Sequence, residues 1–116
     1  MEPIVLSQLA EELSSRARQE EHAGRAAQNL LSGQWHPLSQ TVIALLAGHE
    51  LAEHDSPGEA TLQVLSGRVR FAAASGGCDL VAGELLPIPR ERHAVAAAVD
   101  SVLLLTVVKD SRSAHP

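Results

Sequence analysis

Residues 48–67 read GHELAEHDSPGEATLQVLSG, and this stretch decides the architecture that the sequence predicts. Glycines stand at both ends, and a Ser-Pro-Gly run interrupts the stretch at 56–58. These residue types adopt or permit turn geometry. Two short apolar runs of strand length, 51–54 and 60–65, lie between the breaks. The stretch therefore predicts two strands joined by a tight turn, with a second turn at Ser66-Gly67.

The same alternation of short apolar runs and turn residues continues on both sides of this stretch. It predicts strands at 25–31, 38–47, 51–54, 60–65, 68–73, 78–81, 84–88, 93–98 and 102–108. The chain has 116 residues, the length of one ordinary domain. So many short strands in one domain indicate an all-β sandwich or barrel, and we expect closure into a barrel because closure removes exposed strand edges.

In residues 7–23 the apolar side chains recur with a different period from that of the strands. Leu6, Leu9 and Leu13 recur at the spacing of one helix face, with Ser7 as the expected N-cap and Gly24 as the expected stop. We therefore expect an N-terminal helix (1–24) that packs on the barrel or on a dimer partner, then a barrel (25–109) and a flexible tail (110–116).

Composition excludes several classes of partner. The nine basic residues are scattered and the formal net charge is −5, which argues against nucleic acid. Trp35 and Phe71 are the only aromatic residues, too few for a base-stacking platform. No apolar run approaches the roughly 20 residues of a membrane helix, so we expect no membrane partner. The N-terminus lacks a basic opening and Cys78 is the single cysteine, so the expected location is the cytoplasm.

Two segments resemble the conserved motifs of the cupin family. Residues 48–67 resemble its first motif, a glycine, five residues, a histidine (His54) and a strand that ends in Val-Leu-x-Gly. Residues 83–93 read GELLPIPRERH and resemble its second motif, which leads through a proline to another histidine (His93). Residues 53–61 are similar to a branch of small, uncharacterised cupins. The resemblance implies a cupin-type double-stranded β-helix, the jelly-roll barrel.

The resemblance also implies a metal site, from which this sequence departs. Metal-binding cupins carry His-x-His, a glutamate and a final histidine. Here the first and last histidines fall on His54 and His93, but the second falls on Ser56 and the glutamate on Ala60. Glu59 is one residue out of phase, and the preceding Pro-Gly turn could bring it inward. The predicted metal ligands are therefore His54, Glu59 and His93, a set of residue types that suits Zn, Fe, Mn or Ni.

Three functional hypotheses follow from these residues. The first is a metal-dependent enzyme that acts on a small molecule, with His54 and His93 as catalytic residues and Gln63, Ser56 and Arg92 as ligand-binding residues. The second is a metal-free ligand-binding or sensor module, and the third is a purely structural role. Whether the chain is an enzyme stays open. We expect a homodimer, because cupins commonly pair and because the leucine face of the helix needs cover.

Overall fold

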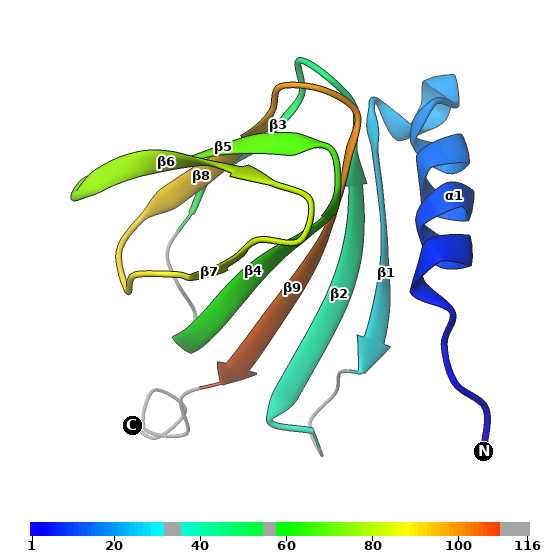
Figure 1. The fold of residues 1–116 in the computed structure, drawn as a ribbon, viewed down its shortest axis with the longest axis horizontal. Helices are drawn as coiled ribbons and strands as arrows, with labels where there is room; N and C mark the ends of the chain where they lie inside the picture. The colour runs from blue at the N-terminus through cyan, green and yellow to red at the C-terminus, as the bar shows by residue number, and fades with distance from the viewer. Residues whose placement is uncertain (32–35, 55–57, 110–116) are drawn as a thin grey trace.

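A computed structural model describes residues 1–31, 36–54 and 58–109. Within them two antiparallel sheets face each other, and a helix, α1 (Leu6–Ala17), lies on the outside, followed by a short 3-10 turn (Glu20–His22) (Figure 1). One sheet has five strands in the order β1 (Arg25–Leu31), β2 (Leu38–Leu45), β9 (Ser101–Lys109), β4 (Gly58–Ser66) and β7 (Leu85–Pro87). The other has four, in the order β3 (Glu50–His54), β8 (His93–Ala97), β5 (Arg68–Ala73) and β6 (Gly76–Val81).

The predicted all-β jelly-roll fold is confirmed, and each of the nine predicted strands has a counterpart within the described residues. The prediction of a closed barrel is wrong. Among the described residues no ladder joins the two sheets, and β6 and β7 are edge strands of different sheets. β7 has only three residues, and a strand this short offers few unpaired backbone groups. The edge is therefore protected without closure.

The main core fills the space between the sheets. Strand β4 illustrates the alternation that builds it. Leu62 and Val64 point inward and are almost fully buried, whereas Leu65 packs outward against the helix layer. The other buried members of this core are Ile43, Val69, Phe71, Leu80, Ile88, Val95 and Leu103. Because strand residues alternate between faces, one strand contributes to two separate cores.

A second core lies between α1 and the outer face of β1, β2 and β9. Leu9, Leu13 and Ala17 are buried there against Val42 and neighbouring residues of the sheet. The leucine face of the helix is thus covered within the chain, and it does not require a dimer partner. No helix in the described ranges is long and apolar enough to cross a bilayer.

The predicted helix limits are wrong at both ends. The helix begins one residue before Ser7, and Val5 is the N-cap, without a side-chain hydrogen bond. It ends at Ala17, well before Gly24. The sequence continues with two glutamates at 20 and 21, residue types that do not extend an apolar contact with the sheet. The flexible tail predicted at 110–116 lies outside the described residues.

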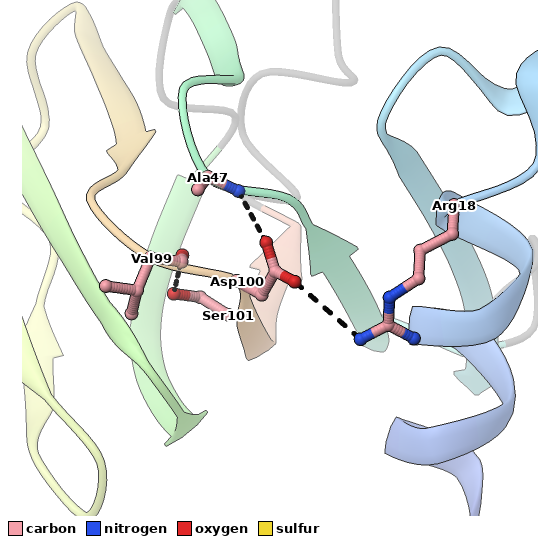
Figure 2. A network of polar contacts seen from close by, with 5 residues as sticks. All are labelled: Arg18, Ala47, Val99, Asp100 and Ser101. Atoms are coloured by element: carbon pink, nitrogen blue, oxygen red, sulfur yellow. Dashed lines mark hydrogen bonds and ion pairs between the residues drawn. The ribbon is translucent and has the colours of Figure 1, made fainter.

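Ser101, which is 2% exposed, joins the turn before β9 to the start of β5. Its hydroxyl accepts a hydrogen bond from the backbone N–H of Arg68 at 3.0 Å and donates to the carbonyl of Val99 at 2.7 Å. The neighbouring Asp100 accepts a hydrogen bond from the N–H of Ala47 at 2.9 Å, and its other oxygen lies 3.7 Å from Nη2 of Arg18 (Figure 2). The turn before β9 therefore connects both sheets and the helix.

Candidate functional site

His93 begins β8 and is 4% exposed, between the two sheets. Its ring stacks on Phe71, with centroids 5.2 Å apart and planes inclined by 27°. Nδ1 lies 3.0 Å from the carbonyl oxygen of Glu91. Because a carbonyl only accepts hydrogen bonds, Nδ1 carries the proton, and in the neutral ring the lone pair is on Nε2.

His54 ends β3, and its backbone pairs directly with that of His93 in the antiparallel β3–β8 ladder. The ladder is irregular between Leu51 and His54, where the register shifts. Two histidines that are distant in the chain are therefore cross-strand partners at one end of the four-stranded sheet.

The pairing continues across this sheet as a row of small residues. His93 pairs with Ala73 on β5, and Ala73 pairs with Gly76 on β6. Gly76 lines a hollow of about 260 Å³ that we call the edge cavity, because it lies between the unjoined edge strands β6 and β7. The residues around the edge cavity are Phe71, Ser75, Gly76, Gly77, Cys78, Leu86 and Pro89. Phe71 connects this cavity to His93, because it lines the cavity and stacks on the imidazole.

A carboxylate joins the two sides of the edge cavity. Glu91, in the loop before β8, accepts hydrogen bonds from the backbone N–H of Ser75 at 2.7 Å and from the Ser75 hydroxyl. These two hydrogen bonds lower the pKa of the Glu91 carboxyl below its ordinary value of 4.5, and the one from the hydroxyl has the larger effect. The loop before β8 is thus tied to the β5–β6 turn.

The other predicted site residues lie apart from His93. Glu59 is exposed and Gln63 is half-buried, and both are on the face of β4 opposite to Leu62 and Val64. The prediction that Glu59 turns inward is wrong, because Glu59 follows the regular alternation of β4. Arg92 is exposed in the loop before β8, and Ser56 lies outside the described residues.

The position where metal-binding cupins carry a glutamate holds Ala60, which packs against the apolar core. In the parts of the chain that the structure describes, no group of three or more His, Cys, Asp or Glu side chains could hold a metal ion. A site of three protein ligands, such as those of catalytic zinc or non-haem iron, is therefore not assembled by these described residues.

A larger hollow of about 510 Å³ lies on the outside of the molecule, between α1 and strands β4 and β9. Leu65 and Val102 lie on the sheet side, and Glu11 and Arg18 on the helix side. It contains no histidine or cysteine, so its chemistry is that of an amphipathic surface groove and it is separate from the two histidines.

The sequence did not single out Glu91, Ser75 or Phe71 for the site. Glu91 stands between two arginines, a pattern that usually indicates a solvated surface. Ser75 begins a Ser-Gly-Gly turn. Their positions in the sequence could have indicated them. Glu91 lies two residues before a motif histidine, and Ser75 is in the turn that follows the strand of Phe71.

Comparison with known proteins supports the architecture. No family model matches the sequence, and no curated protein does. Among solved structures, a conserved protein of unknown function from Streptococcus pyogenes, SPY1581, is 30% identical over 74% of this chain and 75% of that chain, with a TM-score of 0.68.

Two further structures share the fold at lower identity. A cupin superfamily protein from Desulfitobacterium hafniense, DSY2733, is 19% identical over 95% of this chain and 94% of its own, with a TM-score of 0.77. Salicylate 1,2-dioxygenase from Pseudoaminobacter salicylatoxidans, solved as adducts with gentisate, is 19% identical, with a TM-score of 0.76, over 90% of this chain but only 32% of its own. The chain is therefore a small protein with the cupin fold, and it belongs to the same family as the streptococcal SPY1581 protein.

Proposed function

We propose that this protein binds a small organic molecule between its sheets, with the imidazoles of His54 and His93 as the polar contacts and without a tightly held metal. The observation that carries the proposal is the backbone pairing of His54 with His93 in the β3–β8 ladder. Directly paired residues of an antiparallel ladder lie opposite each other in the sheet, and we take these two histidines to serve one ligand.

Small and apolar residues lie between His93 and the edge cavity. Ala73 and Gly76 form the row of paired residues that leads from His93 to this cavity. Phe71, Leu86 and Pro89 supply an apolar wall. Binding sites of this kind are mostly apolar, with a few polar groups that orient the ligand. An imidazole can accept a hydrogen bond from a hydroxyl or, when protonated, pair with a carboxylate.

This chemistry indicates hydroxylated aromatic carboxylates as the first ligand class to test. Gentisate, which is bound in a dioxygenase structure of the same fold, belongs to this class. The proposal requires binding alone and assigns no reaction.

A metal-dependent enzyme is the second candidate, and one observation favours it. The bond from His93 Nδ1–H to the Glu91 carbonyl leaves Nε2 as the lone-pair nitrogen, an arrangement common among metal-bound histidines. Two imidazoles nevertheless do not make a tight site, and the predicted third ligand, Glu59, is exposed on the other face of β4. We therefore rank metal-free binding first. A divalent metal, if held, would be held by His54 and His93 and would polarise a ligand oxygen.

The experiment compares untagged wild-type protein with the double variant His54→Ala/His93→Ala and with Glu59→Ala as the matched control. Each is titrated with gentisate by calorimetry and analysed for metal content. We expect binding to wild type, at least tenfold weaker binding to the double variant, an unchanged Glu59→Ala variant, and little metal in any of the three.

Equal affinity of wild type and the double variant would refute the site, and no binding of gentisate to wild type would refute the ligand class. Stoichiometric metal that disappears in the double variant would establish the second candidate instead.

The homodimer stays a prediction that rests on the cupin resemblance. The mass of the protein in solution, measured by light scattering, tests it.

A further inference from the structure

Glu91 makes contacts in two directions from one short loop. Its carboxylate accepts two hydrogen bonds from Ser75, in the turn between β5 and β6. Its carbonyl oxygen faces Nδ1 of His93 at 3.0 Å. Its own N–H donates to the carbonyl of Pro89 at 2.8 Å, which closes a tight turn and limits the freedom of the loop. The side chain of Glu91 thus contacts the cavity wall, and its backbone contacts the candidate ligand-binding histidine.

The contact with Ser75 lies at the edge cavity. Ser75, Gly76 and Gly77 form one wall of the cavity, and we call these three residues the rim. Pro89, on the opposite wall, precedes Glu91 in the same loop. The Glu91 carboxylate joins the rim to this loop through two hydrogen bonds from Ser75, both at the surface of the molecule.

We propose that Glu91 is a positioning residue, which holds the rim of the edge cavity against the loop before β8 and thereby fixes the tautomer and direction of the His93 imidazole. The proposal rests on the proposed function only in taking His93 as the ligand contact. Glu91 acts through His93 and the rim and does not itself touch the ligand.

Removal of the carboxylate has two separable consequences. The rim loses both hydrogen bonds and moves away from the loop, so the edge cavity opens more often. The loop loses its anchor, so the Glu91 carbonyl no longer holds Nδ1–H of His93 in one place, and the ring samples both neutral tautomers.

Each consequence has its own reporter in the chain. Cys78 is the single cysteine, is half-buried and lines the edge cavity, so the rate of its reaction with a disulfide reagent such as dithiodipyridine measures opening. The nitrogen chemical shifts of the His93 ring distinguish the two tautomers, and a His93→Ala spectrum assigns them among the six histidines.

The experiment compares wild type with Glu91→Ala, Glu91→Gln and a matched control, Glu84→Ala. Glu84 is a suitable control because its carboxylate also accepts a backbone hydrogen bond, from Val81 at 2.8 Å, in a turn away from the rim. All measurements are made without ligand and under conditions in which melting curves show each variant folded.

For Glu91→Ala we expect about tenfold faster modification of Cys78, and ring nitrogen shifts of His93 that move toward a tautomer mixture. Glu91→Gln keeps an acceptor oxygen for Ser75 but loses the charge, so its Cys78 rate and His93 shifts should lie between those of wild type and Glu91→Ala. Glu84→Ala should match wild type.

Equal Cys78 rates in Glu91→Ala and Glu84→Ala, or unchanged His93 shifts in Glu91→Ala, would overturn the proposal. Because neither readout uses a ligand, failure here is distinct from failure of gentisate to bind. A Glu91→Ala variant that does not fold leaves Glu91→Gln to decide, since loss of the charge alone should give a smaller increase in the same direction. No increase in Glu91→Gln would then count against the proposal.

Discussion

Replacement of Gly67 by alanine should destabilise the fold strongly, because this residue forms the corner where the chain passes from β4 in one sheet to β5 in the other. Its φ is +89°, a conformation that costs an L-residue about 1–2 kcal/mol. A Cβ atom built there would lie 2.3 Å from Oγ of Ser101 and 2.5 Å from the carbonyl oxygen of Asp100. The second contact is with backbone, so it cannot be relieved by a change of rotamer.

Crowding of this kind in a packed region costs about another 1–3 kcal/mol. Gly67→Ala should therefore lose about 2–5 kcal/mol of unfolding free energy, which corresponds to roughly 10–20 °C in Tm for a domain of this size. Gly83→Ala is the matched control. Its φ is +90°, yet no atom lies within 4 Å of the added methyl group, so we expect only the conformational cost, about 1–2 kcal/mol.

Urea denaturation of wild type and both variants, followed by circular dichroism, measures the three free energies. The difference between the two variants isolates the steric part. If Gly67→Ala is no less stable than Gly83→Ala, the close approach of the two turns does not contribute to stability and the reasoning is refuted.

Two further predictions concern the turn before β9, and a third concerns Glu91. Ser101→Ala should lower the free energy of unfolding in urea by about 1–2 kcal/mol, since the buried serine loses its hydrogen bonds with the N–H of Arg68 and the carbonyl of Val99. Ser66→Ala, at an exposed position, should lower it little, and equal losses would contradict this. Asp100→Ala should lower the free energy of unfolding by about 1 kcal/mol, and Arg18→Ala by less than about 0.5 kcal/mol, because Asp100 accepts a backbone hydrogen bond while its ion pair with Arg18 is exposed and long. The reverse order in melting experiments would show that the ion pair dominates. The pKa of the Glu91 carboxyl is lower in the folded protein, so its contribution to the free energy of unfolding is present above its ordinary pKa of 4.5 and is lost as the pH falls through the lowered value. The stability difference between wild type and Glu91→Gln should therefore vanish over that acid range. A stability difference that is independent of pH would exclude a role for the charge.

The strands could be predicted from sequence because their signals are local. The limits of β1 and β5 agree with the prediction at both ends, since turn residues stand on either side of each strand in the sequence. The helix was predicted too long because sequence alone does not say where the sheet beneath it stops. Closure was also inferred incorrectly, because the contact between edge strands β6 and β7 depends on how the two sheets face each other.

The candidate site was predictable only in part. The cupin motifs indicate His54 and His93, and the ladder pairs their backbones. The side on which Glu59 lies depends on the phase of β4 after a turn, which residue types do not specify. The bond from Ser75 to Glu91 joins residues 16 positions apart in different loops, and such pairs follow from tertiary packing.

The strand order of the larger sheet has a consequence for biosynthesis. β9 lies at its centre, between β2 and β4, yet it is translated after both of them. While a ribosome is still adding residues 101–109, the nascent chain therefore exposes two unpaired edges that await the same strand. Productive folding must wait for that last insertion, and a nascent chain that stalls before it offers a ready template for association with its neighbours.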